Sequence, residues 1–115
     1  MSENIGNEKV TFNKGIKYEI FLGIKDKDSY LEVLSVEDFK SILMEICTEK
    51  RISFTLLTQL GGYTHGKGYT TETSLRVIII GLDEDEVALL GEHLKKKVNT
   101  DAILITKTEL EYCYM

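Results

Sequence analysis

A glycine-rich segment at residues 61–69 carries most of the side chains that could bind a ligand. It reads Gly-Gly-Tyr-Thr-His-Gly-Lys-Gly-Tyr and lies between two apolar runs typical of β-strands. Glycine lets backbone N–H groups turn toward an anion, Lys67 adds positive charge, and two tyrosines, Tyr63 and Tyr69, offer faces on which a base could stack. With His65 between them, these residues favour a nucleotide-like ligand.

A second interpretation of the same segment stays open. Gly66 and Gly68 can simply occupy positive-φ positions at the tip of a long hairpin, with no ligand involved. Composition does not decide between the two.

Arg76 is the other candidate for anion binding. The alternation of its strand places it beside Ile78 and Ile80, on the face of the sheet that the helices leave open. A guanidinium in apolar surroundings needs a carboxylate or phosphate partner. Arg76 therefore binds a ligand phosphate or forms a salt bridge between subunits, to a residue such as Glu109 or Glu111.

No catalytic constellation is recognisable elsewhere in the chain. His65 and His93 lack the spacing of metal ligands, and no serine or cysteine has a recognisable base. We therefore expect no catalytic residue, no bound metal and no cofactor, and predict a binding protein without enzyme activity.

Composition narrows the class of protein further. The chain has 115 residues, 43% of them hydrophobic, which is typical of one globular domain. Its net charge of −5 makes nucleic acid an improbable partner. No apolar run approaches the roughly 20 residues that span a bilayer, and the polar start lacks a secretory apolar region. We expect a cytosolic protein with its two cysteines, Cys47 and Cys113, reduced.

The elements that position these residues begin near Lys17. Residues 1–16 are polar and predict a flexible arm or a short edge strand, and residues 17–115 predict a single α+β ligand-binding domain. From Tyr18 to Ile24 apolar residues alternate, which predicts a strand with one face in the core. Phe21 then points to the opposite face.

Two helices follow from their start signals. Ser35 and Asp38 have the spacing of a capping box ahead of a helix at residues 36–49. Asp83 opens a second helix, which has three lysines in its last turn and ends before Asn99.

Apolar runs at residues 53–60, 74–80 and 102–106 predict the remaining strands, and residues 110–114 predict a further C-terminal strand. The order β-α-β-β-α-β is that of the ferredoxin-like sandwich, an antiparallel sheet with both helices on one face.

The uncovered face of this sheet is predicted to be apolar. Residues 74–80 are apolar on both sides of the strand, and Phe21 adds to the exposed cluster. A homo-oligomer, dimeric or dimer-based, would cover that face. The alternative is that the tail, residues 109–114, folds over it within one chain.

Four short motifs resemble the Thoeris anti-defence sponge family of phage and prophage proteins. They are Ile-Lys-Asp-Lys-Asp at 24–28, the glycine-rich run at 61–68, Thr-Ser-Leu-Arg at 73–76 and Val-Asn-Thr-Asp-Ala-Ile at 98–103. The likeness spans roughly residues 17–107.

This resemblance implies a non-enzymatic protein of the host cytosol that sequesters a cyclic ADP-ribose isomer at a subunit interface and so blocks TIR-domain defence. Tyr63 or Tyr69 would stack on adenine, and Arg76 and Lys67 would meet the pyrophosphate. Thr73 departs from the family, which tends to have asparagine before its Ser/Thr-Leu motif.

Two other classes share the expected fold. A PII-like regulator would form trimers and bind ATP or ADP, whereas a dimeric α+β-barrel monooxygenase or isomerase would need a buried histidine or acid, for which the sequence has no clear candidate. The predicted ligand-binding set comprises Phe21, Tyr63, His65, Lys67, Tyr69, Thr73 and Arg76.

Overall fold

The computed structural model describes residues 2–5, 8–32, 34–100 and 102–115. In chain order its elements are β1 (Ser2–Ile5), β2 (Glu8–Thr11), β3 (Asn13–Gly23), α1 (Val36–Lys50), β4 (Thr55–His65), β5 (Gly68–Ile80), α2 (Glu84–Val98) and β6 (Leu104–Tyr112).

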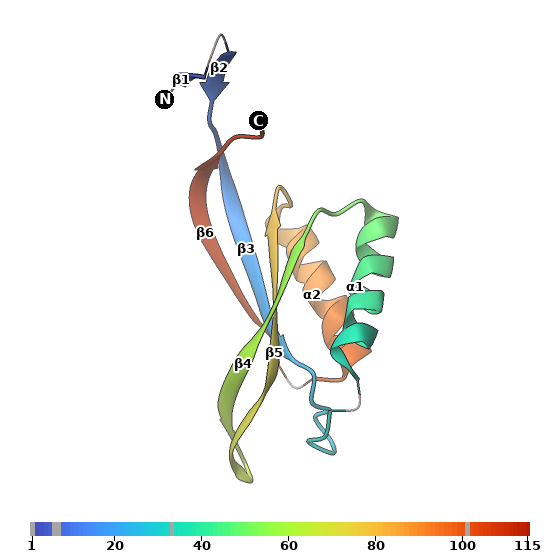
Figure 1. The fold of residues 1–115 in the computed structure, drawn as a ribbon. Helices are drawn as coiled ribbons and strands as arrows, with labels where there is room; N and C mark the ends of the chain where they lie inside the picture. The colour runs from blue at the N-terminus through green and yellow to red at the C-terminus, as the bar shows by residue number, and fades with distance from the viewer. Residues whose placement is uncertain (1, 6–7, 33, 101) are drawn as a thin grey trace.

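The sheet has the predicted ferredoxin-like plan. Four antiparallel strands lie in the order β4-β5-β3-β6, and β1 and β2 form a separate two-stranded sheet. Figure 1 shows both helices on one face of the four-stranded sheet. The predicted fold class is confirmed.

Each helix begins at the residue that its sequence signal indicates. The Asp38 N–H donates to Ser35 Oγ and the Ser35 N–H donates to the Asp38 carboxylate, both at 3.0 Å, so the capping box of α1 is complete. The Glu86 N–H likewise donates to Asp83 at 2.8 Å ahead of α2. Asn99 ends α2 in the left-handed conformation, at φ 56°.

The core lies between the sheet and the helices. Alternate residues of β3 and β5 face it, as Ile20 and Val77 do with no exposed surface. Phe39 and Leu43 of α1 and Leu94 of α2 are equally buried against them. Burying these side chains provides the main driving force for the fold.

The glycine-rich segment belongs to a β-hairpin whose strands run closer to the turn than the strands predicted at residues 53–60 and 74–80. The β4–β5 ladder continues through Gly61↔Glu72 and Tyr63↔Thr70 to its last pair at the turn. In this extended backbone successive amides point in opposite directions, so they do not converge on an anion as they would in an irregular loop. Gly68 has a positive φ of 122°, as the hairpin interpretation expected, whereas Gly66, for which it expected the same, does not.

The C-terminal residues continue β6 and do not form a further strand. β6 pairs with β3 as far as Asn13↔Tyr112, so its end lies beside β3 and does not cross the sheet. This rules out the alternative in which the tail covers the open face within one chain, at least up to Tyr112.

The paired ends of β3 and β6 extend beyond the helices, toward β1 and β2 (Figure 1). The described residues span 59 × 29 × 25 Å with a radius of gyration of 17.0 Å, whereas a compact chain of this length would have about 13 Å. β3 begins at Asn13, and the domain boundary at Lys17 stays a prediction. None of the helices described is long and apolar enough to cross a membrane.

The open face of the sheet carries a small ion network among apolar side chains. Arg76 Nη1 lies 3.3 Å from Glu19, and Lys17 Nζ lies 3.2 Å from the same carboxylate. Within its own chain Arg76 is thus paired with Glu19, and the salt bridge between subunits to Glu109 or Glu111 stays a prediction.

Candidate functional site

A pocket of about 620 Å³ lies where β3 leaves the sheet, between the β4–β5 hairpin, the loop after β3 and the segment that enters β6. Its lining includes Phe21, Gly23, Tyr30, Tyr63, His65 and Glu72.

The strand register explains why these side chains meet. Residues opposite each other in an antiparallel pair point to the same face, and Gly61 is paired with Glu72. Counting in steps of two along β4 places Tyr63 and His65 on that face. Along β5 the same steps of two lead from Glu72 to Arg76, which is paired with Phe21 of β3. This face is therefore the open face of the sheet.

Glu72 supplies the carboxylate of the pocket. The β3–β5 ladder ends at Gly23↔Ser74, and beyond it the Lys25 N–H donates to Glu72 Oε2 at 3.3 Å instead of to a strand carbonyl. A Cβ at Gly23 would overlap the carboxylate of Glu72. The absence of a side chain at Gly23 therefore makes the room in which this carboxylate lies, over the backbone of β3.

Opposing influences set the charge of Glu72. Burial raises the pKa of its carboxyl, the Lys25 N–H and the Lys25 charge lower it, and nearby Glu32 raises it further. The ammonium of Lys25 is held by other groups, Thr70 Oγ1 at 2.9 Å and the Thr71 carbonyl at 3.0 Å. A half-buried carboxylate of this kind would be stabilised by a cationic group on a ligand.

Three aromatic rings form a row at the mouth of the pocket. The Tyr63 and His65 rings are tilted at 5.6 Å between centroids, and Tyr30 stacks on His65 at 4.6 Å with 24° between the planes. Lys67 Nζ lies 5.0 Å from the centroid of Tyr30. Such rings offer flat apolar faces to a nucleobase.

The loop that carries Tyr30 is fixed at its start. Asp26 accepts the N–H groups of Asp28 and Ser29, each at 3.0 Å, and Asn99 Nδ2 donates to the Asp26 carboxylate from the end of α2. Together these hydrogen bonds hold the pKa of Asp26 below its ordinary value, and the bond from Asn99 has the largest effect.

Of the predicted ligand-binding residues, Phe21, Tyr63 and His65 line the pocket. Arg76 lies on the same face, two residues along β5 from Ser74. Its guanidinium forms a salt bridge with Glu19.

The remaining three predicted residues lie outside the lining. Tyr69 and Thr73 have the opposite parity on β5: the Tyr69 hydroxyl lies against Gly62, and the Thr73 N–H donates to Glu32 at 3.4 Å. Lys67 is in the turn, and its N–H donates to His65 Nδ1 at 3.0 Å.

Sequence reasoning missed two residues of the site, Glu72 and Tyr30. Glu72 has the parity of Arg76, and that alternation could have drawn attention to it. Tyr30 follows a charged loop and belongs to no periodic pattern of apolar residues, so its local sequence did not indicate a role.

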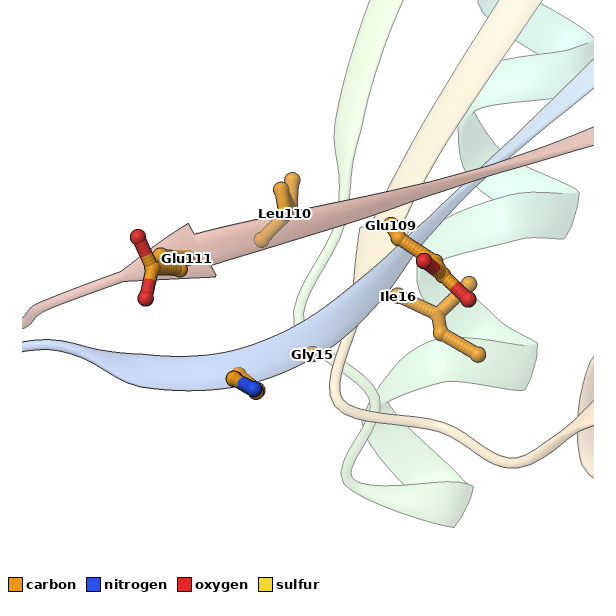
Figure 2. A pocket seen from close by; sticks show the side chains of 6 residues that line it. Gly15, Ile16, Glu109, Leu110 and Glu111 are labelled. Atoms are coloured by element: carbon orange, nitrogen blue, oxygen red, sulfur yellow. The ribbon is translucent and has the colours of Figure 1, made fainter.

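A second hollow, of about 820 Å³, lies against the paired ends of β3 and β6. Its lining residues are Lys14, Gly15, Ile16, Glu109, Leu110 and Glu111. Figure 2 shows the labelled side chains spread along the two strands instead of gathered around one point. Its lining residues include no aromatic side chain, although the Tyr112 ring lies against Gly15, and their polar groups do not converge, so it is the weaker candidate.

In the part of the chain that the structure describes, no three His, Cys, Asp or Glu side chains are grouped so that they could hold a metal ion.

Solved structures with the same fold include an enzyme. A phage SAM lyase in complex with S-methyl-5′-thioadenosine aligns with a TM-score of 0.68 and 23% identity, over 87% of this chain and 88% of that chain. The same lyase in its apo state aligns with a TM-score of 0.66. The sequence matches no protein-family model and no curated protein.

PII-like proteins share the fold as well. CPII, a nitrogen regulatory PII-like protein from Thiomonas intermedia K12 bound to ADP, AMP and bicarbonate, aligns at 13% identity and a TM-score of 0.53, over 89% of this chain and 98% of that chain. The GlnK–ATP complex of B. subtilis aligns at 15% identity and 0.53, over 84% and 82%. At these identities the likeness establishes the fold.

The prediction of a protein without enzyme activity is contradicted by the likeness to SAM lyase. That prediction rested on the lack of a nucleophile with a matching base, whereas a lyase acting on a substrate with a built-in leaving group needs neither. None of these similar structures is a Thoeris sponge, so the resemblance to that family gains no support from them.

Proposed function

We propose that the chain is a lyase that cleaves S-adenosylmethionine and releases 5′-methylthioadenosine. The observation that carries the proposal is a half-buried carboxylate, Glu72, beside a row of aromatic rings in one pocket. The shared fold with a SAM lyase that binds the same product supports it.

S-adenosylmethionine matches the two parts of the pocket. Its adenine is a flat ring system that Tyr63 and its neighbours can stack against. Its sulfonium and α-ammonium groups are the cations that Glu72 requires, because burial works against an unpaired carboxylate there. ATP and ADP fit less well, since their phosphates would meet a carboxylate.

The reaction needs no water and no external base. The substrate's own carboxylate attacks its Cγ, forming a C–O bond, while the bond from Cγ to sulfur breaks and its electron pair returns to sulfur. A neutral thioether, 5′-methylthioadenosine, and a cationic homoserine lactone result, so atoms and charge balance. Glu72 binds the α-ammonium, and the pocket holds the tail folded for this attack.

The open face is part of the same proposal. The pocket lies on the face that one chain leaves uncovered, so a second copy packed there would close the site from the other side. We place the activity in the cytosol of a phage-infected cell, in keeping with the phage source of the similar lyase.

The test is turnover of S-adenosylmethionine by the purified protein, with chromatography for both products. We expect 5′-methylthioadenosine and homoserine lactone in equal amounts, with no oxygen taken up from ¹⁸O-labelled water. Glu72→Gln should lower kcat/KM by about 100-fold, mainly through a higher KM, since it removes the ion pair with the α-ammonium. Glu109→Gln, a change in the other hollow, should leave the rate unchanged.

The Gly23→Ala variant tests the position of the Glu72 carboxylate separately from its charge. The new methyl group would displace the flexible carboxylate of Glu72 and leave the ladder intact. We expect a loss of about tenfold or more in kcat/KM for this variant, in line with the sensitivity of catalysis to small displacements.

Failure to form 5′-methylthioadenosine in the wild-type protein would refute the proposal. Recovery of bound ATP or ADP would then favour a PII-like regulator, and recovery of an intact cyclic ADP-ribose isomer would favour sequestration.

A further inference from the structure

Tyr30 and His65 join the loop after β3 to the β4–β5 hairpin at the pocket. Tyr30 belongs to the loop between β3 and α1, and His65 is the last residue of β4. Their rings are stacked at 4.6 Å, and both residues line the pocket. The stack therefore forms part of the pocket wall.

The backbone of Tyr30 is held in an unfavourable conformation. Its φ is 57°, in the left-handed region that bulky residues seldom adopt. Such a conformation persists when surrounding contacts compensate for it. Here the Tyr30 N–H donates to the Asp26 carbonyl at 2.8 Å, and the Tyr30 ring contacts His65 and lies 5.0 Å from the Lys67 ammonium.

His65 is itself oriented by the hairpin turn. The Lys67 N–H donates to His65 Nδ1 at 3.0 Å, so Nδ1 carries no proton and the ring is fixed relative to the turn. Tyr30 thus stacks on a ring whose position is set in advance.

The backbone of this loop is hydrogen bonded along its length. The Lys27 N–H donates to the Asn99 carbonyl at 3.0 Å, and the N–H groups of Asp28 and Ser29 donate to Asp26. The ring of Tyr30 can leave His65 by rotation about its side-chain bonds, which breaks none of these backbone hydrogen bonds.

We propose that Tyr30 and His65 form an aromatic clasp that opens to admit a nucleoside ligand and closes over it. The nucleoside class rests on the proposed function, whereas the clasp itself rests on the stack and the strained loop. A clasp of this kind slows the escape of ligand more than it changes its entry.

Two substitutions at one position test the clasp. Tyr30→Asn removes the ring but keeps a residue that tolerates positive φ, and Tyr30→Phe keeps the ring. With 5′-methylthioadenosine as the probe, we expect Tyr30→Asn to dissociate about tenfold faster than wild type, and Tyr30→Phe within about twofold of it. Stopped-flow displacement measures both rates.

A second measurement needs no ligand. Amide hydrogen exchange over residues 26–32 should be about tenfold faster in Tyr30→Asn than in wild type and unchanged in Tyr30→Phe, because loss of the stack frees the loop. Equal exchange in wild type and Tyr30→Asn would overturn the clasp.

The two proposals fail in distinguishable ways. If wild type does not bind 5′-methylthioadenosine, the proposed function is wrong while the exchange data still decide the clasp. If wild type binds it and Tyr30→Asn releases it no faster, the clasp is wrong and the proposed function stands.

Discussion

Glu72 supplies the half-buried carboxyl group of the site. Its carboxyl is held where β3 and β5 separate, over a glycine that leaves room for it. Burial favours the neutral form, and Lys25 favours the charged form. The net effect raises the pKa of Glu72, so the charged form costs stability until a cation balances it.

Replacing Glu72 by glutamine should therefore stabilise the protein at neutral pH. The folded-state pKa lies above the ordinary value near 4.5, so the carboxylate destabilises the fold once it is ionised, and glutamine removes that cost. Since water still reaches the site, we expect a gain of less than about 1 kcal/mol. Thermal unfolding at pH 7.5 should show the gain.

The same comparison at low pH provides the control. Below the ordinary value of 4.5 both folded and unfolded chains carry a protonated Glu72, so the advantage of Glu72→Gln should vanish there. Glu111→Gln, an exposed carboxylate on the β6 ribbon, should show no such pH dependence. A destabilised Glu72→Gln at pH 7.5 would mean that the hydrogen bond from Lys25 outweighs burial.

Glu72 and Tyr30 show what a single sequence leaves open at this scale. The role of Glu72 depends on where the β3–β5 ladder stops, which local residue patterns do not specify. Tyr30 depends on a left-handed backbone conformation stabilised by a ring 35 positions away in the chain. Phe21 could be predicted from strand alternation, whereas Tyr63 and His65 were singled out by their residue types in the glycine-rich segment.

At the level of elements, local signals specified the helices well. The capping box at Ser35 and the acidic residue Asp83 predict the starts of α1 and α2, and the structure shows a complete capping box at each. The strands of the hairpin were predicted too short, because glycine suggests a loop when its cross-strand partner is unknown. The Tyr69 hydroxyl lies against Gly62, and the ring of Tyr112 covers Gly15 in the same way, an arrangement that fills the space beside strand glycines.

The cap of α2 provides a test of element stability. Asp83→Ala removes the acceptor for the Glu86 N–H, bonded at 2.8 Å, and should destabilise the fold by about 1 kcal/mol. Urea unfolding would show a lower midpoint with an unchanged slope.

Asp83→Asn is the matched control for this cap. Asparagine keeps the capping oxygen, so its cost should be a few tenths of a kcal/mol at most. Equal losses for the two variants would show that the negative charge at the helix start matters and the capping bond does not.

At the scale of the whole molecule, the open face of the sheet lacks a covering layer. Leu57 and Leu104 are 38% and 59% exposed there, on either side of Arg76 and Phe21. Arg76 Nε is buried without a hydrogen-bond partner among the residues described. The paired ends of β3 and β6 also extend beyond the helices, and a two-stranded ribbon is only marginally stable by itself. Each feature favours association with a second copy.

Leu57→Lys should therefore break the assembly. The new charge would sit on the open face opposite Arg76, where burial at an interface would cost several kcal/mol without a partner. Light scattering coupled to gel filtration at micromolar concentration should show an oligomer for wild type and a monomer for Leu57→Lys. Because the pocket lies on the same face, the variant should also lose affinity for 5′-methylthioadenosine.

Leu89→Lys is the matched control, since Leu89 is 63% exposed on α2, away from the open face. It should remain oligomeric and active, because lysine at an exposed helix position disturbs neither core nor interface. A wild-type protein that is monomeric at this concentration would contradict the interface. If such a monomer still cleaved S-adenosylmethionine, one chain would suffice to form the site, and the second copy would have no part in the chemistry.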